Sequence, residues 1–572
     1  MPEPFLQTQA PASVQAPAAP PAAPKADDGI SSPQPASSAA PAPAAAPQPA
    51  PTFADLLHKA LDAFAAAPLE GRDVKERREL RAAVADLYGT RQYAPLWLDD
   101  GKPNAAAKSA MARLAHAGDD GLSLDGMPAP VFTQDADGLA TAEINLTMQV
   151  VAYARQASGS RIEPLRIGRL IGAKPAIPAP SAILTSVAAA GADAGTVLEA
   201  FNPPQAGYRA LRDKLAELRR EMPTARGPIP RGPTLRVGMS DPRVPLIRAK
   251  FGLDTAQESA SKNLRYDTRV AAAVAHFQKA YGLPASGVLT TRTIAALSGG
   301  QPSRLEAELI ANMEMWRWMP RDMGKNRIEV NIPDFTVRAF RDDKMVWSNK
   351  VIVGKPKTPT PVFSSLIHYV IVNPYWNVPP SIVRKEMLPK LEQDPTYLAR
   401  MGFETFTRHG HLVVRQPPGP KNALGRIKFI FPNDYAVYLH DTPARHLFND
   451  KRRAFSHGCV RVDEPFGLAQ AVFGPDSRWT EQRVERLVGG ARHYINLPEP
   501  MPIHIEYFTA FVDADNHLQL RDDLYGYTRK VALALGLESR RLQGHEAVSI
   551  ESRRIKRRRS AQPERPSEFA PD

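Results

Sequence analysis

The sequence predicts a multidomain α+β protein, in which a helical scaffold domain and a small helical module precede a β-rich domain with an inserted lid. Three observations carry this prediction. The chain has 572 residues, enough for several domains at roughly 100 to 200 residues each. Its 56 prolines are too many for one compact fold and indicate long linkers. The apolar residues recur with a helical period up to about residue 318 and with a strand-like period after it.

The composition restricts the class of partner and the redox chemistry. Apolar residues make up 43% of the chain, so large cores can be buried. Lys and Arg number 73 against 60 Asp and Glu, and the net charge of +13 favours anionic partners such as cell-wall polymers, lipid headgroups or nucleic acid. A single cysteine excludes an intramolecular disulfide, and its thiol is either catalytic or a small buried hydrophobe.

Both ends of the chain are predicted to be disordered. Residues 1–52 are nearly all Ala, Pro, Gln and Ser and are expected to form a semi-stiff tether. The first residues lack the basic and apolar regions of a secretory signal, and no stretch reaches the roughly 18 consecutive apolar residues of a membrane span. Residues 540–572 hold the basic run 553–559, which we interpret first as a solvated end and second as a contact for anionic envelope polymers. Nucleic acid is disfavoured, because no base-reading motif or stacking aromatics accompany the run.

The helical scaffold domain is predicted over residues 53–230. An aromatic corner at residues 93–98 interrupts it, and the Gly/Pro-rich segment 227–233 marks its end. Apolar residues follow a helical period in four stretches, at residues 56–64, 80–88, 105–114 and 211–220.

A second, smaller helical module is predicted over residues 234–298. Its helices are expected at residues 244–251 and 267–281, the latter with Val270, Val274 and Phe277 on one face. A further helix is expected at residues 305–318.

The β-rich domain is predicted over residues 320–530. Short β-branched runs separated by turns indicate strands at residues 328–332, 336–340, 350–353, 367–372, 436–440 and 503–512. Residues 374–425 interrupt this pattern with Trp376, several prolines and a helix-like stretch at residues 381–391. This interval is interpreted as a lid inserted into the β domain.

The candidate nucleophile is Cys459, in the run Ser456-His457-Gly458-Cys459. A free thiol has a pKa of about 8.5, and a neighbouring imidazole or a helix N-terminus can lower this pKa. His457 lies two residues away, and His440 lies 19 residues upstream. A strand ending at His440 and a loop returning through residues 446–455 would place His440 beside Cys459, whereas the ring of His457 tends to point away. We therefore assign the role of general base and acid to His440.

Four neighbours of Cys459 are expected to support the site: Ser456, His457, Gly458 and Arg461. Gly458 suits a sharp turn, and the N–H groups of Gly458 and Cys459 would then form an oxyanion hole. Ser456 is expected to order the loop by hydrogen bonding. Arg461 is either a fixed cation for a substrate carboxylate or a structural salt-bridge partner, and the sequence favours neither.

The run His440-Asp441-Thr442, followed by residues 456–462, resembles the signature of the L,D-transpeptidase catalytic domain of the YkuD type. Further motifs resemble its large scaffolded subgroup, which also carries Arg at the position of Arg461 where shorter members usually have Asn. These motifs are residues 353–355, 358–361, 373–379, 522–526 and the region around 93–97. Residues 277–297, with Gly282-Leu283-Pro284 and Gly287-Val288-Leu289, resemble a peptidoglycan-binding module; the alternative is a helical spacer without a ligand.

The resemblance implies a reaction and its partners. Cys459 would attack the amide between meso-diaminopimelate and the terminal D-Ala of a peptidoglycan tetrapeptide stem, giving a thioester and releasing D-Ala. A diaminopimelate amine of a second stem would then form a 3→3 cross-link; a D-amino acid would give exchange, and water would give carboxypeptidase activity. Tyr375 and Trp376 of the lid would cover the bound stems. Carbapenems are expected to acylate Cys459, and no cofactor is expected.

The resemblance also implies a periplasmic or cell-envelope location in a Gram-negative host. The missing signal then requires a true start upstream, a trimmed exported form or an unrecognised route. Two competing hypotheses are a non-catalytic wall-binding scaffold and a zinc site using His409, His411 or His446. Ligand spacing disfavours zinc, so no metal is expected. The sequence leaves the oligomeric state open.

Overall fold

The computed structural model describes residues 51–68, 74–221, 229–230, 232–253, 263–281, 283–298, 303–408 and 410–537. The predicted tether lies outside the described residues except for residues 51 and 52, and the predicted basic tail lies wholly outside them. Buried apolar side chains of the described residues form four clusters, which belong to a helical region, a small helical module, a β-rich domain and the lid. The predicted fold class is confirmed.

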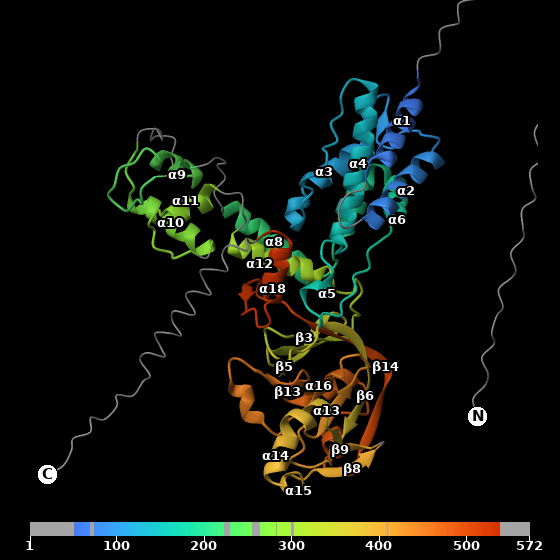
Figure 1. Cartoon of the computed structure of the whole chain (residues 1–572), viewed down its shortest axis with the longest axis vertical. Coiled ribbons are helices and arrows are strands. Elements are labelled where there is room, and N and C mark those ends of the chain that lie inside the picture. The colour runs from blue at the N-terminus through green and yellow to red at the C-terminus, as the bar shows by residue number, and fades with distance from the viewer. Residues whose placement is uncertain are drawn as a thin grey trace, which may run out of the picture. The chain divides into compact units, whose positions relative to one another are not determined.

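The N-terminal helical region has its own core (Figure 1, blue to cyan). Thr52 begins the first helix with a capping box, in which its hydroxyl and the Asp55 carboxylate each accept a backbone N–H. The longest helix, α4, buries residues on nearly all its faces and was not predicted as a separate element. The elements are α1 (Phe53–Ala66), α2 (Val74–Thr90), β1 (Leu98–Asp99), β2 (Lys102–Pro103), α3 (Ala105–Ala115), α4 (Ala136–Ala157), α5 (Pro164–Ile167), α6 (Pro180–Ala190) and α7 (Ala194–Glu199).

The aromatic corner is buried as the sequence indicates, and a carboxylate inside the core holds it. Trp97 is fully buried, and its indole N–H donates to Thr147 Oγ1 at 2.8 Å. The Glu143 carboxylate accepts the backbone N–H groups of Leu96 and Trp97 and the hydroxyl of Tyr88. The desolvation of Glu143 raises its pKa to about 6.

One helical stretch, Pro180–Glu199, has the length and mean hydropathy, 1.3, of a membrane span. The stretch bends at Gly191, where α6 ends with φ +51°. Its buried side chains, among them Ile183, Leu184 and Leu198, pack in the core of the helical region. Length and composition alone therefore give no membrane assignment.

The small module is built from α9 (Val244–Lys250), α10 (Thr268–Ala280) and α11 (Thr291–Ser298). Val270, Val274 and Phe277 of α10 are buried together, as predicted. A bridge between Leu235 and Leu289 joins the start of the module to the turn before α11.

Helix α12 (Arg304–Trp316) links the helical region to the β-rich domain. It packs against α8 (Ala206–Glu221) and α18 (Tyr527–Ala534), and all three contribute to the β domain's core cluster. The buried Glu314 carboxylate accepts from Arg161 at 2.5 Å and from Arg317 at 3.5 Å. These ion pairs tie the segment after α4 to α12.

The β-rich domain contains a nine-stranded mixed sheet with the order β12-β5-β13-β11-β10-β6-β14-β3-β4. Because β4 also pairs with β5, the sheet closes on itself around the apolar core. Helices α16 (Pro465–Phe473) and α17 (Glu481–Glu485) contribute buried side chains to this core. The strands are β3 (Arg327–Asn331), β4 (Thr336–Arg341), β5 (Lys344–Gly354), β6 (Phe363–Val372), β10 (Ile427–Ile430), β11 (Leu439–His440), β12 (Ala454–Ser456), β13 (Val460–Val462) and β14 (His493–Glu506).

Two predicted strands differ from the structure. The strand expected at residues 436–440 is reduced to β11, because Ala436 has φ +53° and the Asn433 side chain binds the backbone of the preceding turn. The strand expected at residues 503–512 is broken after Glu506, where Asn312 and Asn331 accept the backbone N–H groups of residues 508–510. The chain then forms a separate hairpin of β15 (Ala510–Val512) and β16 (Leu518–Leu520).

The inserted segment forms a small subdomain with its own sheet and core. Strands β7 (Trp376–Asn377), β9 (His411–Gln416) and β8 (Glu404–Arg408) pair in that order. The predicted helix is present as α13 (Pro380–Ile382), a π-helix (Val383–Met387) and α14 (Leu388–Gln393), followed by α15 (Tyr397–Arg400). Five buried residues make its core: Val378, Val383, Met387, Leu398 and Val414.

Candidate active site

Cys459 lies in the tight loop between β12 and β13. Gly458 has φ +125°, a conformation that side chains rarely adopt, so the turn requires glycine. The buried hydroxyl of Ser456 donates to the carbonyl of Cys459 at 2.5 Å and accepts the N–H of Gly458 at 3.1 Å. These bonds fix the loop that presents the thiol.

A second layer supports the loop from behind. Thr360 Oγ1 accepts the N–H of Gly354 and donates to the carbonyl of Gly458, each at 2.8 Å. Tyr525 donates its hydroxyl to the carbonyl of Gly354 at 2.7 Å. A Cβ at Gly354 would lie 2.2 Å from the carbonyl oxygen of Thr358, so the close approach needs glycine. The motifs at residues 353–361 and 522–526 thus meet behind the cysteine.

Strand register places five polar or ionisable side chains on one face of the sheet. β11 pairs with β13 in parallel, with Leu439 opposite Val460 and His440 opposite Arg461. β10 pairs with β11, with Lys428 opposite His440. Leu439 and Val460 are fully buried, and side chains alternate along a strand, so the other face carries Lys428, Tyr438, His440, Cys459 and Arg461.

His440 is buried and held by its own backbone environment. Its Nδ1 lies 2.5 Å from the carbonyl oxygen of Asp441, which it meets as a donor, leaving Nε2 as the acceptor in the neutral ring. Burial, with the charges of Arg461 and Lys428, lowers its pKa to about 3, and the carbonyls of Asp441 and Leu424 only partly offset this. The imidazole is therefore neutral over the physiological pH range.

The direct neighbour of the Cys459 sulfur is Tyr438. The hydroxyl and the backbone of Tyr438 both act to lower the pKa of the Cys459 thiol. Burial nevertheless dominates and raises the pKa of the thiol, against the lowering effects of Tyr438, Lys428 and Arg461. The sequence pointed to an imidazole or a helix N-terminus as the group that can lower this pKa. Here Tyr438, Lys428 and Arg461 act in that direction, and burial outweighs them although Cys459 is partly exposed.

Two cations lie beside the thiol without a carboxylate partner in the described part of the chain. Lys428 Nζ stands 3.6 Å from the centroid of the Tyr438 ring, and desolvation lowers its pKa. Desolvation also lowers the pKa of Arg461, whose Nε is buried and makes no hydrogen bond. The salt-bridge interpretation of Arg461 therefore finds no support, and its guanidinium remains available to a ligand.

The expected oxyanion hole is only half available. The N–H of Gly458 is already donated to Ser456 Oγ. The backbone N–H of Cys459 makes no hydrogen bond within the residues that the structure describes. Only the second donor of the predicted pair is free in this structure.

The lid contacts the cysteine loop through one ion pair. His457 Nε2 lies 2.7 Å from Glu386 Oε1, and Glu386 belongs to the lid's π-helix. Trp376 is half-buried in the lid core, where its ring centroid lies 6.0 Å from that of Phe403. The guanidinium of Arg415 stacks on Tyr375 at 4.5 Å. Both aromatic residues thus pack against other side chains of the inserted segment.

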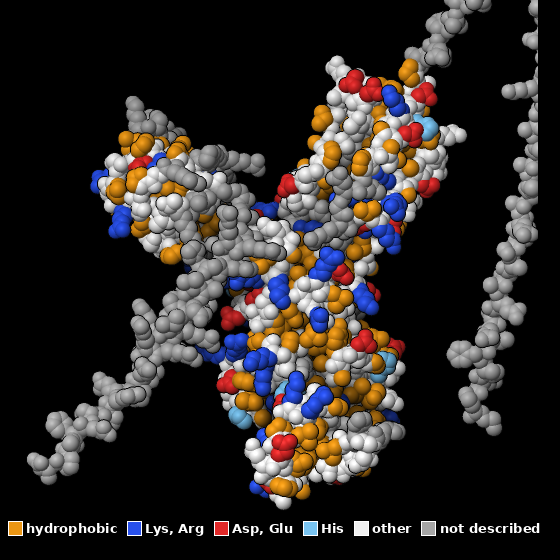
Figure 2. Space-filling model, in the orientation of Figure 1, with side chains coloured by type: hydrophobic (Ala, Val, Ile, Leu, Met, Phe, Trp, Pro, Cys, Tyr) orange, Lys and Arg blue, Asp and Glu red, His pale blue; other side chains and the backbone are white. Residues whose placement is uncertain are grey.

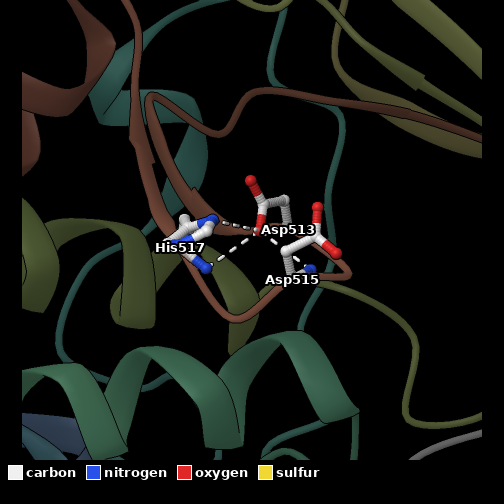
Figure 3. A group of neighbouring side chains, drawn as sticks. All are labelled: Asp513, Asp515 and His517. Atoms are coloured by element: carbon white, nitrogen blue, oxygen red, sulfur yellow. Dashed lines mark hydrogen bonds and ion pairs between the residues drawn. The ribbon is translucent and has the colours of Figure 1, made fainter.

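Two of the three histidines considered for zinc cannot be placed as ligands, because His409 and the side chain of His411 lie outside what the structure describes. The third, His446, lies in a short 3-10 helix (Arg445–Asn449). Within the described ranges, one group of side chains brings its potential ligand atoms within 4.8 Å of one another: Asp513, Asp515 and His517 (Figure 3). Asp513 Oδ1 already accepts the backbone N–H groups of Asp515 and His517, so this group shapes the hairpin turn between β15 and β16.

The sequence analysis missed Tyr438, Lys428 and Glu386. Tyr438 lies two residues before His440, so the alternation of side chains along a strand was the signal that could have found it. Lys428 could be found only from the pairing of β10 with β11, and Glu386 only from the folded lid.

Comparison with known proteins agrees with this geometry. The family model of the L,D-transpeptidase catalytic domain, YkuD, matches residues 325–473. The chain contains an L,D-transpeptidase catalytic domain. A scaffold domain model matches residues 82–215, and one described as "Putative peptidoglycan binding domain" matches residues 249–297. The resemblance seen in the sequence is confirmed.

A Haemophilus influenzae protein named "Putative L,D-transpeptidase" is 35% identical over 251 residues, which are 41% of this chain and 50% of that protein. The chain therefore spans about half the length of this curated relative. Among solved structures, an L,D-transpeptidase from Mycobacterium smegmatis is 13% identical over 32% of this chain and 58% of its own, with a TM-score of 0.18. One from Xylanimonas cellulosilytica is 16% identical over 48% and 98%, with a TM-score of 0.15. At these scores the two structures carry no argument about the L,D-transpeptidase domain.

Proposed function

We propose that this protein is a cysteine-dependent peptidoglycan L,D-transpeptidase that forms 3→3 cross-links between meso-diaminopimelate residues. The observation that carries the proposal is the shared sheet face that holds Cys459, Tyr438, His440, Lys428 and Arg461. The match to the catalytic domain family supports the reaction class.

The first half-reaction forms a thioester. Cys459 Sγ attacks the carbonyl carbon of the diaminopimelate–D-Ala amide while His440 takes the thiol proton. The C–N bond breaks, and His440 returns the proton to the departing D-Ala amine. The neutral imidazole of His440 suits this role, because it carries no proton on Nε2 before the attack.

The second half-reaction resolves the thioester. A diaminopimelate side-chain amine of another stem attacks the thioester carbonyl, loses a proton to His440, and the C–S bond breaks. The Cys459 sulfur takes the proton back and the enzyme is restored. Water in place of the amine gives a carboxypeptidase, and a free D-amino acid gives exchange.

The neighbouring polar groups stabilise the charges that form. The hydroxyl of Tyr438 donates to the sulfur as it becomes a thiolate, and the nearby charge of Lys428 adds to this effect. Arg461 is a cation for a stem carboxylate, since it has no carboxylate partner in the described protein. The free N–H of Cys459 is the oxyanion donor.

The lid and the accessory parts serve the same reaction. The lid, about residues 374–425, covers the stems through Tyr375 and Trp376 and limits hydrolysis by excluding water. The module at residues 234–298 binds peptidoglycan, and the scaffold domain at residues 53–230 supports the catalytic domain at residues 320–530. Figure 2 shows Lys and Arg side chains spread over the visible face of the protein, which suits an anionic polymer in the periplasm.

Mass spectrometry of the full chain tests the proposal. Wild type and Cys459→Ala are incubated with a disaccharide-tetrapeptide and, separately, with meropenem. We expect a thioester adduct and 3→3 dimers from wild type only. His440→Gln should slow acylation strongly, whereas His446→Gln, a matched change of an exposed histidine, should not. If the tetrapeptide gives tripeptide without dimers, the protein is a carboxypeptidase. If neither compound gives an adduct, the protein is not a cysteine-dependent enzyme of this class.

A further inference from the structure

A cavity of about 620 Å³ lies away from Cys459, where α12 ends and strands β6 and β14 meet the segment after α5. Its size falls within the range of roughly 300 to 1,000 Å³ typical of ligand pockets. One wall is residues 316–321 and another is residues 172–176. The remaining walls come from residues 203 and 205 and from Val362, Phe363 and Ser364.

Hydrogen bonds fix these walls relative to one another. The N–H of Gly172 donates to the carbonyl of Val362 at 2.8 Å, and the N–H of Val362 donates to the carbonyl of Leu170 at 2.8 Å. The Gln205 side chain donates to the carbonyls of Pro320 and Arg321 at 2.8 and 3.1 Å. The cavity is therefore a formed space between packed elements.

The lining is cationic. Lys174 and Arg321 contribute positive charge, and no Asp or Glu is among the described residues that line the cavity. Arg317 also lines it, but its charge is already paired with Glu314. Lys174 is exposed and makes no ion pair within the described ranges. Arg321 donates hydrogen bonds to the carbonyls of Ala200, Phe201 and Asn202. Its charge is therefore not neutralised by a carboxylate among the described residues. Such a lining favours an anion.

The same lining offers polar atoms that make no hydrogen bond within the described residues. Trp316 and Trp318 are more than nine-tenths buried, and their indole N–H groups have no hydrogen-bond partner. Gln205 Oε1 is also without a partner. Ser364 donates to Nδ1 of the buried His504 at 2.8 Å, while His504 Nε2 donates to the carbonyl of Met323, so the Ser364 oxygen remains an acceptor at the cavity wall. Aromatic rings with neighbouring donors and acceptors suit a sugar or an amide.

We propose that this cavity is a second binding site for peptidoglycan, which takes a carboxylate-bearing sugar–peptide unit of the polymer away from the thiol. The inference rests on the proposed function for the identity of the polymer, and on the lining for the chemistry. Lys174 and Arg321 bind the peptide carboxylate, and the unpartnered indole N–H groups of Trp316 and Trp318 donate to the sugar or the amide. Binding here would hold a strand on the enzyme while Cys459 acts on one of its stems.

The cavity also adjoins the segment that leads to the catalytic strand. Phe363 lines it and lies 5.1 Å, centroid to centroid, from Tyr435. Ser365, the residue after Ser364, donates to the carbonyl of Pro432 at 2.7 Å. A peptidoglycan chain held in the cavity is thus bound next to the turn that precedes Tyr438 and His440.

Hydrogen–deuterium exchange with the full-length Cys459→Ala chain tests the proposal, because it localises binding and turnover is blocked. A soluble disaccharide-tetrapeptide should protect residues 172–176, 203–205 and 316–321. Lys174→Glu should weaken this protection by about fivefold to tenfold in apparent affinity and leave the protection of residues 456–462 unchanged. Lys108→Glu, an exposed lysine of α3, is the matched control and should change neither region.

Two further ligands decide the chemistry. An uncharged N-acetylglucosamine oligomer and inorganic phosphate should each protect the cavity segments far less than the tetrapeptide. If phosphate protects the cavity segments as well as the tetrapeptide does, the cavity binds anions in general. If the oligomer protects them equally, the cavity binds the sugar and the peptide carboxylate is not needed. No protection of the cavity at millimolar tetrapeptide would overturn the proposal.

A separate readout keeps this test independent of the catalytic proposal. In the chain that retains Cys459, Lys174→Glu should be acylated by meropenem at the wild-type rate, because Lys174 lies outside the cysteine site. If wild type is not acylated by meropenem, the proposed function is refuted, but the exchange result still shows whether the cavity binds the tetrapeptide. A slower acylation of Lys174→Glu alone would mean that the substitution disturbs the fold. Trp318→Phe, which keeps an aromatic side chain and removes the indole N–H, would then decide whether the tetrapeptide still needs the cavity.

Discussion

Buried charge is handled differently in two regions of this molecule. Around α12, the arginines meet carboxylates: Arg161 and Arg317 contact Glu314, and Arg113 contacts Asp120. On the sheet face beside Cys459, Lys428 and Arg461 have no carboxylate partner in the described residues, although the carboxylate of Asp441 lies close in sequence. Asp441 instead binds Arg426 and Arg445.

The difference separates charges that hold the fold from charges that await a ligand. Burying an ion is costly unless an opposite charge compensates it. Lys428 and Arg461 therefore lower the stability of the fold. Around α12 the compensation is internal and the charges connect elements of the fold. Beside Cys459 the missing negative charge is supplied, in the proposed reaction, by the thiolate and by the substrate carboxylate.

The largest effect is expected from breaking the compensated group. Glu314→Gln keeps the side-chain shape but leaves Arg161 and Arg317 without a buried counter-charge. We expect the free energy of unfolding to fall by about 3 to 5 kcal/mol, measured by urea denaturation. Glu217→Gln, which removes the carboxylate of a partly exposed pair with Lys214, should cost at most about 1 kcal/mol. Equal losses from both changes would contradict the comparison.

Breaking the uncompensated group should have the opposite signature. Arg461→Met removes a buried cation that has no carboxylate partner in the described chain, so stability should be unchanged or slightly higher. Acylation by the tetrapeptide should fall by about 10-fold to 100-fold, the range for one charge-assisted hydrogen bond. Mass spectrometry over time gives the rate, and Arg452→Met supplies an exposed control in the loop before β12. A variant that unfolds more easily but reacts normally would return Arg461 to a structural role.

Tyr438→Phe tests whether the hydroxyl next to the sulfur matters. Its removal takes away a donor to the thiolate, so the already raised pKa of the Cys459 thiol should rise further. Only the thiolate is alkylated, and the iodoacetamide reaction of wild type should therefore accelerate up to and beyond pH 9, without a plateau near neutral pH. At pH 8 the variant should react about 3-fold to 10-fold more slowly. A pH profile that coincides with the wild-type profile would remove Tyr438 from the site.

The sequence predicts the fold class well because it depends on local patterns, and a local pattern also carries the prediction that Cys459 is the nucleophile. Helical periodicity locates α1, α3 and α10, and the run around Cys459 is short and specific. Long α4 escaped because it is buried on most sides and lacks a single apolar stripe.

Properties that arise from pairing and burial were beyond the sequence. The raised pKa of the Cys459 thiol follows from desolvation, which a motif does not show. Lys428 enters the site only because β10 lies next to β11, and the Gly458 N–H leaves the oxyanion hole only because Ser456 turns inward. Local rules therefore predicted the nucleophile and missed the neighbouring groups that act on the pKa of its thiol.

The smallest effect is expected at the contact between the lid and the cysteine loop. This contact is paired, like the group around α12, but both of its side chains are half exposed. Glu386→Gln weakens the ion pair to His457, and a pair of this exposure is worth about 1 kcal/mol or less. The lid should open more often and admit water, so the ratio of tripeptide to 3→3 dimer should rise about twofold to fivefold while thioester formation stays within twofold of wild type. Glu392→Gln, a lid carboxylate in α14, is the control. If the product ratio does not move, the ion pair does not close the lid, and the exclusion of water must come from the lid's apolar side chains.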